Sequence, residues 1–576
     1  MKKTLNIVLF ALMLSGCYKD KGNYEYTLDT MNEITSVTFS PSIAETANGK
    51  VIEVQQALGE DDLTRRIDVN VEQTLLQDLE ELDFNWFLTY AGDNGKTVND
   101  TINSKGFLEV ELPVGKEMVY NVFLQIYDRT TTLSHYSAFK IMTRPVFKNS
   151  LFVLHGEEGN RKLGNIEVIG SETNVYTDIQ SVIPGNIYSN AIGLAYTTYY
   201  DIAMDNVTGK WIMDETNALT VFNNGSGTMV YNPYGMTVKF VSGQIFKPES
   251  EEFVFKKMVQ TGDPSNFSQY KVALSENGEV YIGNVVHALY RPGYACEVYD
   301  NDPLHQSDYQ ITAAAITHNR FVFWDAKNKR FLYSAKNSNG IASDEQASQD
   351  RELMSTNPML DAHVDFSGLT DSPEDMTAVM GYVNYRDNYE EQSAYFIFKD
   401  ENTGSFYRYQ LTALATGGAE KVNSRSDGKR SDEAKPAFSL ECQKMKNFSP
   451  TNEETVTYNS WFTTNNLFYA EGNKVYKYNV SNGDNIVVYE APEGYTVTTI
   501  KFRNEDSSSF GSDLGRYLSI GLYNGSVGAV AEIKFNTAAD IDEEFATLFY
   551  EVDDKGKSWG RIKDFQFVRE YIYKMD

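Results

Sequence analysis

The feature that most constrains the fold is a β-hairpin pattern that recurs after Asn149. An apolar strand, a polar turn rich in Gly, Asn or Asp, and a second aromatic strand follow one another seven times. Apolar runs separated by such turn residues are typical of antiparallel hairpins. The predicted hairpins lie at 151–154 with 165–168, 210–213 with 218–222, 270–274 with 279–282, 320–324 with 330–333, 394–398 with 405–409, 466–470 with 474–478, and 517–522 with 529–535.

The spacing of these hairpins predicts a β-propeller. Successive hairpins start 50 to 74 residues apart, which leaves room for two further strands and so for a four-stranded blade. Because one blade cannot bury both of its faces, blades pack radially against each other. We expect residues 146–576 to form seven blades, with a six- or eight-bladed ring or a β-helix as alternatives. The strand-like stretch 563–573 is expected to complete the first blade and close the ring.

Residues 33–145 follow a period-two pattern instead. Alternating segments such as 34–39, 66–71 and 119–127 are separated by turns that contain Gly, Asp or Asn. Roughly seven short strands in about 110 residues predict an immunoglobulin-like β-sandwich with Trp86 in its core. Pro145 ends this domain, because proline holds the preceding residue extended. The predicted fold class is therefore all-β, a sandwich followed by a propeller.

The start of the chain carries an export pattern. Lys2 and Lys3 precede a short apolar run, 5–14, that is too short to span a bilayer as a folded helix. The run ends in Leu-Ser-Gly-Cys17, which resembles the bacterial lipobox. This resemblance implies that residues 1–16 are removed, that Cys17 is lipidated, and that residues 17–32 form a tether. The alternative is an ordinary signal peptide that happens to contain a cysteine.

The residues that follow the lipobox carry a second resemblance. The sequence from Cys17 reads Cys-Tyr-Lys-Asp-Lys-Gly-Asn-Tyr-Glu-Tyr and resembles the opening of the PKD-like lipoproteins of Bacteroidota. That family is typically encoded beside transporter and glycan-capture lipoproteins of the SusC/SusD type, which implies an outer-membrane location and such a partner. Lys19-Asp20 partly matches a signal for the cell surface, although Lys21 stands where a second acidic residue is expected. The cell surface is therefore expected over the periplasmic face.

The predicted sandwich also resembles PKD-type domains in strand order and size. It has Trp86-Phe87-Leu88-Thr89-Tyr90 in place of the usual Trp-Asp-Phe-Gly-Asp-Gly signature. The resemblance is therefore to the divergent PKD-like group, and the calcium or glycan roles of true PKD domains do not carry over.

Charge and cysteine content exclude several functions. The chain has 80 acidic and 51 basic residues, a formal net charge of −29, which disfavours nucleic acid and electrostatic binding to anionic lipid. Membrane contact should therefore come from the acyl chains on Cys17. Apart from Cys17 there are only Cys296 and Cys442, either two buried thiols or a single disulfide.

Signals for catalysis are weak. The six histidines show no metal-ligand spacing, and we find no Gly-x-Ser-x-Gly elbow, phosphate loop or dinucleotide fingerprint. Paired carboxylates are too common in an acidic chain for spacing to identify a glycosidase pair. No metal and no cofactor are expected.

Aromatic loops are the candidate ligand-binding sites. Their rings suit the C–H faces of sugars, and their polar neighbours suit hydroxyls, whereas inter-blade packing is the alternative role. The candidates are Tyr199, Tyr200, Tyr290, Arg291, Tyr294, Tyr382, Tyr385, Arg386 and Tyr389.

One further motif resembles the Asp-box of sialidase-type propellers. It comprises Asp554, Gly556, Ser558 and Trp559, with Val552 in place of the expected Ser or Thr. In those families the box stabilises a turn between outer strands and is not catalytic, so a structural role is expected here too.

Together these patterns predict a non-catalytic lipoprotein that binds glycan or another polymeric nutrient for a SusC/SusD-type system. One alternative is a propeller glycoside hydrolase or lyase, which needs carboxylates, or a Tyr/Arg/Glu set, at the central channel. The other is a structural partner of the transporter complex, which needs an exposed apolar patch.

Overall fold

The computed structural model describes most of the chain after the predicted tether. It describes residues 32–568, except for 47–48, 56–62, 76–78, 92–96, 105, 113–118, 145–146, 148–149, 170–171, 180–187, 205–210, 225–227, 234–235, 242–253, 261–269, 285–289, 293–308, 318–319, 336–358, 384–392, 415–437, 460–461, 463–465 and 504–513. The chain divides into two compact units between Arg144 and Pro145. In the described residues, helical structure is limited to four 3-10 turns, η2 (Leu79–Glu81), η3 (Pro373–Asp375), η4 (Glu453–Thr455) and η5 (Leu514–Arg516).

The first unit is a β-sandwich of two sheets. Its strands are β1 (Ile34–Ser40), β2 (Ala44–Thr46), β3 (Gly49–Gln55), β4 (Leu63–Gln73), β5 (Leu82–Ala91), β6 (Thr97–Ser104), β7 (Phe107–Leu112), β8 (Val119–Asp128) and β9 (Ser134–Arg144). One sheet has the order β1-β4-β7 and the other β2-β3-β9-β8-β5-β6. All pairs are antiparallel except β3 with β9.

Period-two alternation places the sandwich core between the two sheets. Trp86 on β5 is fully buried, with Leu124 of β8 beside it in the ladder and Leu108 of the facing sheet in the same apolar cluster. The indole N–H of Trp86 donates to Ser104 Oγ at 3.0 Å, so the ring is buried without leaving its polar atom unpaired. The predicted immunoglobulin-like sandwich and the core position of Trp86 are confirmed.

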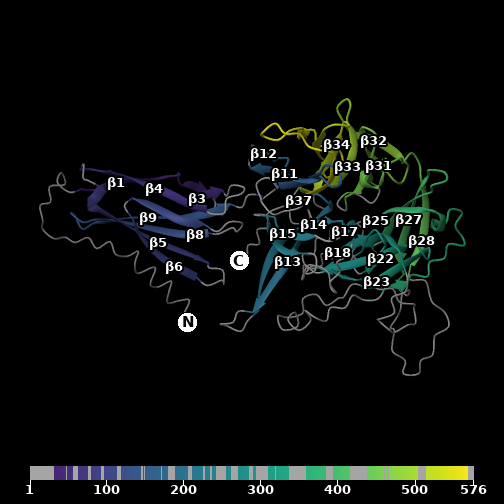
Figure 1. Ribbon diagram of the computed structural model, residues 1–576, viewed down its shortest axis with the longest axis horizontal. Coiled ribbons are helices and arrows are strands. Elements are labelled where there is room, and N and C mark those ends of the chain that lie inside the picture. The colour runs from purple at the N-terminus through teal and green to yellow at the C-terminus, as the bar shows by residue number, and fades with distance from the viewer. Residues whose placement is uncertain are drawn as a thin grey trace, which may run out of the picture. The chain divides into compact units, whose positions relative to one another are not determined.

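The second unit contains seven four-stranded sheets, which we number as blades 1 to 7 (Figure 1). Blade 1 comprises β37 (Ile562–Val568), β10 (Ser150–His155), β11 (Lys162–Ile169) and β12 (Glu172–Tyr176). Blade 2 comprises β13 (Ala191–Met204), β14 (Trp211–Asn223), β15 (Met229–Asn232) and β16 (Thr237–Val241), and blade 3 comprises β17 (Phe255–Gln260), β18 (Tyr270–Ser275), β19 (Val280–Asn284) and β20 (Tyr290–Pro292). Blade 4 comprises β21 (Ile311–Ile316), β22 (Arg320–Asp325), β23 (Arg330–Ala335) and β24 (Leu360–Asp361), and blade 5 comprises β25 (Thr377–Val383), β26 (Ser393–Lys399), β27 (Phe406–Ala413) and β28 (Phe438–Met445). Blade 6 comprises β29 (Val456–Tyr458), β30 (Asn466–Glu471), β31 (Lys474–Asn479) and β32 (Asp484–Glu490), and blade 7 comprises β33 (Thr496–Phe502), β34 (Tyr517–Tyr523), β35 (Gly528–Lys534) and β36 (Leu548–Tyr550).

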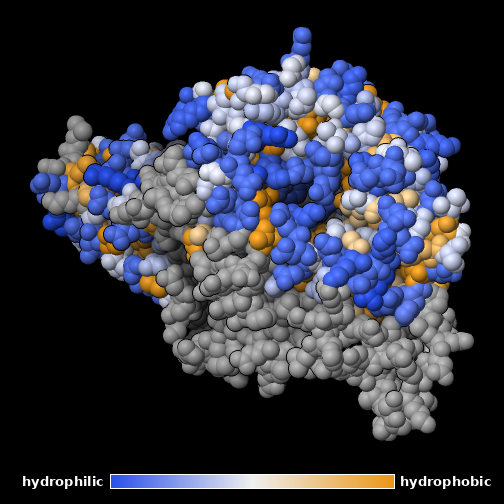
Figure 2. Space-filling view, turned by 45° about the vertical axis from the view of Figure 1, so that its right-hand side comes forward, coloured by the Kyte–Doolittle hydropathy of each residue, from blue (hydrophilic) through white to orange (hydrophobic). Residues whose placement is uncertain are grey.

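Buried clusters between the blades show that the ring is closed. Seven apolar clusters occupy the seven boundaries, from blades 1 and 2 through to blades 7 and 1. Each cluster draws residues from both neighbouring sheets, which gives every blade face a partner. The described surface in Figure 2 is mainly hydrophilic, with hydrophobic residues in small groups. The predicted seven-bladed propeller is confirmed.

Strand β37 closes the ring. It pairs antiparallel with β10 from Ser150 opposite Val568 to His155 opposite Ile562, so the last described strand is the innermost strand of blade 1. The boundary beside it holds a buried ion pair in which Arg503 Nε donates to Glu532 Oε1 at 2.7 Å. The Arg503 guanidinium lies 4.8 Å from the centre of the Phe567 ring of β37. The predicted closing role is confirmed for residues 563–568, and residues 569–573 of the predicted stretch lie outside the described residues.

The predicted hairpins correspond to the second and third strands of each blade, with one error. The hairpin expected at 210–213 and 218–222 is wrong, because Trp211–Asn223 is a single strand, β14. Within β14, only residues 219–221 pair with β15. The rest of β14 pairs with β13 alone. The polar run 214–217 therefore lies in a two-stranded extension of the blade. Its polar residues resemble those of a turn in the sequence, which explains the false hairpin.

Ring closure predicts a large loss of stability from Phe565→Ala. Phe565 lies on β37, is 1% exposed and belongs to the cluster between blades 7 and 1, so its truncation leaves a cavity there. We expect the free energy of unfolding of the propeller to fall by about 3–5 kcal/mol, measured by calorimetry or urea titration.

The matched control is Phe549→Ala on β36, where the ring is 40% exposed. It should cost less than about 1 kcal/mol. Equal losses in the two variants would contradict the closing role of β37.

Candidate functional site

The innermost strands of the blades enclose the centre of the propeller. These strands are β37, β13, β17, β21, β25, β29 and β33. Neighbouring inner strands lie against each other around the ring, and Tyr382 of β25 contacts Tyr458 of β29 with ring centres 5.2 Å apart. A side chain that reaches a blade other than its neighbours must therefore cross the centre.

A β-bulge recurs near the start of six inner strands. One extra residue is inserted opposite the second strand of the blade, which bends the inner strand and redirects its side chains. The extra residues are Ile192, Lys256, Thr312, Val379, Thr498 and Lys563. In blade 6 the 3-10 turn η4, capped by the Asn452 side chain, stands immediately before the inner strand.

Three contacts cross the centre at the level of these bulges. Lys257 of blade 3 donates from Nζ to the carbonyl oxygen of Val379 in blade 5 at 3.0 Å. The same Nζ lies 3.9 Å from Glu453 Oε2 in blade 6, on the opposite side of the ring. Lys563 of blade 1 forms an ion pair with Glu454 of blade 6. These contacts join blades that are not neighbours in the ring, so η4 projects into the centre.

Asp564 supplies the third carboxylate of this cluster. Its Oδ1 lies 3.1 Å from Lys501 Nζ of blade 7, and its Oδ2 accepts a hydrogen bond from the backbone N–H of Leu194 in blade 2 at 2.8 Å. Asp564 therefore links both neighbours of blade 1. We call Lys257, Glu453, Glu454, Lys501, Lys563 and Asp564 the central charge cluster.

The central charge cluster is electrostatically balanced. Its three carboxylates each face a lysine, and desolvation lowers the pKa of Lys257 while the Glu453 carboxylate opposes that shift. A glycoside hydrolase needs one carboxyl group free to donate a proton and a second free to act as base or nucleophile. The three carboxylates of the central charge cluster instead contact lysines of other blades.

These six residues were missed by the sequence analysis. Lys501 is the single charge of β33, whereas the other five each stand beside a second charged residue, and the signal that could have found them is their position in the blades. Five of them lie within the first three residues of an inner strand or just before it, and Lys501 lies near the end of β33, which becomes visible only when the blades are aligned by strand.

Of the predicted aromatic ligand residues, the structure describes the side chain of Tyr382. It is 3% exposed and stacks on Tyr395, with ring centres 5.2 Å apart and planes 22° apart. Burial raises its pKa to about 12. Tyr382 therefore lies in the packing between blades 5 and 6, which was the alternative role for these loops, and shows no ring face to solvent.

The other predicted residues have no described side chain. Tyr199 and Tyr200 lie on β13, and Tyr290 and Arg291 on β20, with only their backbone described. Tyr294, Tyr385, Arg386, Tyr389 and the lipidation candidate Cys17 lie outside the described residues. Cys296 does too, while Cys442 on β28 is half-buried and forms no disulfide among the described residues.

The turn that resembles an Asp-box joins β36 to β37 and is held by Asp553. Its Oδ1 accepts from the backbone N–H groups of Lys555 and Lys557, at 2.9 and 2.8 Å, and Thr177 Oγ1 of blade 1 donates to its Oδ2 at 2.7 Å. Gly556 has φ +75°, which favours glycine. The predicted Asp554 instead accepts from Val175 N at 3.2 Å.

The last two residues of this motif differ in their surroundings. Ser558 forms a bridge with Val552 across the turn, and Trp559 is 1% exposed in the cluster between blades 7 and 1. A Cβ on Gly164 of β11 would lie 2.3 Å from the Trp559 ring, so the indole requires glycine there. The motif thus binds the outer edge of blade 7 to blade 1.

His155 completes this junction. Its ring lies 5.1 Å from the Trp559 ring, centre to centre, at 79°. Nδ1 accepts from the backbone N–H of Gly560 at 2.8 Å, and Nε2 donates to the carbonyl oxygen of Thr177 at 2.6 Å. These two bonds require the neutral imidazole, and burial lowers the pKa of His155 to about 4.

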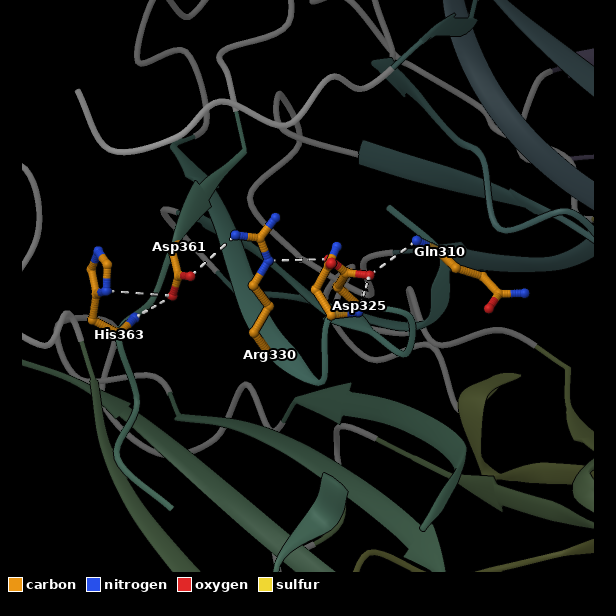
Figure 3. A network of polar contacts seen from close by, with 6 residues as sticks. Gln310, Asp325, Arg330, Asp361 and His363 are labelled. Atoms are coloured by element: carbon orange, nitrogen blue, oxygen red, sulfur yellow. Dashed lines mark hydrogen bonds and ion pairs between the residues drawn. The ribbon is translucent and has the colours of Figure 1, made fainter. Parts of the chain in front are cut away.

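A second polar cluster lies in blade 4, where the β22–β23 turn meets its flanking segments (Figure 3). The buried Asp325 accepts from the backbone N–H of Gln310 at 3.0 Å. Arg330 bridges Asp325 and Asp361, with N···O distances of 3.1 and 3.2 Å, and Asp361 accepts from the N–H of His363 at 2.7 Å. Since backbone amides and one arginine engage both carboxylates, this cluster fixes the turn.

No three His, Cys, Asp or Glu side chains among the described residues lie close enough together to hold a metal ion. No helix in the described part of the chain is long and apolar enough to cross a membrane.

Fold and site together define a two-part protein, a β-sandwich followed by a seven-bladed propeller with a charge-paired centre. The model of the PKD-like family matches residues 17–198, so the match runs past the sandwich through β12 and into β13. No curated protein matches the chain.

Similar solved structures include several propellers at low similarity. They are the yeast heterotrimeric Nup82-Nup159-Nup116 nucleoporin complex (9% identity, TM-score 0.32, covering 73% of this chain and 96% of that chain), the WD40 domain of SCAP from fission yeast (9%, 0.29, 70% and 90%) and the Dos1 propeller (9%, 0.29, 77% and 91%). The seven sheets and seven inter-blade clusters carry the fold assignment.

The neutral His155 predicts a loss of stability in weak acid. Its pKa in the folded chain, about 4, lies below the ordinary histidine value of 6.5, so between these values the unfolded chain binds a proton that the folded chain excludes. The free energy of unfolding should therefore fall as the pH falls from 6.5 towards 4, by up to about 1.4 kcal/mol per pH unit from this group.

Urea unfolding of wild type and His155→Gln at pH 7, 6, 5 and 4.5 measures this contribution. The variant should be less stable at pH 7 and show a shallower pH dependence, whereas His135→Gln on β9 should keep the wild-type slope. Identical slopes for wild type and His155→Gln would rule out a buried neutral His155.

Proposed function

We propose that this protein is a non-catalytic lipoprotein of the outer membrane that binds glycan or another polymeric nutrient at the cell surface. It is anchored by acyl chains on Cys17 and serves a neighbouring SusC/SusD-type uptake system. The lipobox resemblance supports the anchor, and the PKD-like match at residues 17–198 supports the family context from which the uptake role is taken.

The observation that carries the non-catalytic part is the central charge cluster. The carboxylates of Glu453, Glu454 and Asp564 are each within 4 Å of a lysine ammonium of another blade. A pair of carboxyl groups that performs acid–base catalysis has to exchange protons with the substrate, so pairing by lysine works against that role. A propeller hydrolase or lyase is accordingly the less favoured alternative.

The structural-partner alternative has one observation in its favour. Phe87, Phe123 and Tyr136 are exposed together on the sandwich, and exposed aromatic groups occur at protein interfaces as well as at sugar sites. The chemistry around these rings decides between the two.

The proposed function predicts binding of a polysaccharide without cleavage. The chain without its lipidated residue, residues 18–576, is run on native gels containing soluble neutral or acidic polysaccharides, and the same mixtures are assayed for new reducing ends. We expect slowed migration in at least one gel and no reducing ends above the blank. Release of reducing ends that disappears in Glu453→Gln/Glu454→Gln would instead identify a hydrolase that uses the centre.

The proposed anchor predicts that Cys17→Ala abolishes lipidation and attachment to the membrane. Without the thiol no acyl chain can be attached, so incorporation of labelled fatty acid and recovery in the outer-membrane fraction should both be lost. Cys296→Ala should leave both intact. Antibody labelling of intact cells then reports the exposed face, and wild-type chain that is unlipidated but still membrane-bound would contradict the proposal.

A further inference from the structure

The outer face of the six-stranded sheet in the sandwich carries three aromatic side chains that are not part of the core. On β5 and β8 alternate residues point inward, including Trp86, and the residues between them point outward. Phe87, Phe123 and Tyr136 are 39%, 42% and 55% exposed. They lie on the neighbouring strands β5, β8 and β9 (Figure 1). We call these three residues the aromatic platform.

The three rings of the aromatic platform form one continuous surface. Phe87 and Phe123 are direct cross-strand partners, and their ring centres are 6.1 Å apart. Phe123 and Tyr136 stack with centres 5.4 Å apart and planes 28° apart. Contacts between these rings hold them in place at the surface, which lowers the entropy cost of using them as a binding surface.

Rows of amide and hydroxyl side chains flank the aromatic platform. The ladder registers define three cross-strand rows on this face, Asn103-Asn85-Gln125-Tyr136, Thr101-Phe87-Phe123-Ala138 and Asn99-Thr89-Asn121-Lys140. Gln125 fixes the first row, because its Nε2 donates to Ser134 Oγ at 3.0 Å and to the Tyr136 hydroxyl at 3.4 Å. In the third row Thr89 Oγ1 donates to Asn99 Oδ1 at 3.0 Å.

The charge of these three rows differs from that of the whole chain. Of the twelve positions in the three rows, Lys140 alone is charged, whereas 23% of the chain is charged and the net charge is −29. A partner that bears charge would find little to pair with here. Amides and hydroxyls around exposed rings match a neutral ligand that offers both hydroxyl groups and apolar C–H faces.

We propose that the aromatic platform and its flanking amides bind a neutral polysaccharide along the outer face of the sandwich sheet. The C–H faces of the sugar rings lie on Phe87, Phe123 and Tyr136, and the side chains of Asn85, Gln125 and Asn121 bond to hydroxyl groups. This site rests on the proposed function of polymer binding and assigns that binding to the sandwich rather than to the propeller.

The test compares wild type with Phe87→Ala/Phe123→Ala/Tyr136→Ala in residues 18–576. Affinity gels contain a neutral polysaccharide (dextran, laminarin, galactomannan or xyloglucan) or an acidic one (alginate or polygalacturonate). Wild type should be slowed by at least one neutral polymer, and the triple variant should bind it at least about tenfold more weakly, as expected for the loss of aromatic anchors.

Matched variants separate binding from folding. Phe549→Ala removes an equally exposed ring from the propeller and should keep wild-type binding. Phe123→Tyr keeps a ring on the aromatic platform and should also bind. The thermal midpoint of the triple variant should stay close to that of wild type, because exposed cross-strand pairs contribute only about 0.2–1 kcal/mol each.

The outcomes that overturn the proposal are distinct. Equal binding of a neutral polymer by wild type and triple variant overturns the aromatic platform and leaves the proposed function standing. Binding to alginate or polygalacturonate alone overturns the neutral ligand. Failure of wild type to bind any polymer overturns both the aromatic platform and the proposed function. If wild type in that case binds a purified transporter complex and the triple variant does not, the platform is a protein interface instead.

Discussion

The antiparallel pairing of β37 with β10 is the interaction on which the rest of the structure depends. A four-stranded blade exposes two apolar faces, and only a closed ring gives each face a partner. The C-terminal strand supplies the innermost position of blade 1, so both edges of the propeller are satisfied by one ladder. The cluster between blades 7 and 1, the Arg503–Glu532 pair and the junction of His155 with Trp559 all reinforce that ladder.

Closure places charges from several blades at one centre, where they pair with each other. Moving a charge out of water is costly unless a partner is close. The repeated bulges redirect side chains inward, and Lys257, Lys501 and Lys563 meet carboxylates of other blades there. The centre therefore contributes to holding the ring together, while the sandwich carries an exposed and almost uncharged aromatic surface.

The sequence was sufficient for the architecture because the architecture follows local patterns. Hairpin turns and period-two strands recur often enough that the false hairpin in β14 did not change the number of blades. The site was harder, because aromatic residues look alike in sequence whether they pack or bind. Tyr382 lies between two blades, and no local signal distinguishes it from an exposed tyrosine.

The aromatic platform shows a different reason for the same difficulty. Phe123 alternates with the core residues Val122 and Leu124, so the period-two pattern assigns it to the polar face beside Asn121 and Gln125. That assignment holds for one strand only. The meeting of Phe123 with Phe87 and Tyr136 depends on the cross-strand register, which is a tertiary property. Likewise, a shift of one residue decides that Asp553 holds the turn rather than Asp554.

Hydrogen exchange of the backbone amides of the mature chain tests ring closure most directly. Because β10 and β37 are central to one cooperative ring, their amides should exchange together, among the slowest in the propeller and at the rate of its global unfolding. Fast exchange in β37 (Ile562–Val568) with continued protection of β11 and β12 would show that the ring persists without its last strand, and would contradict closure as the basis of the structure.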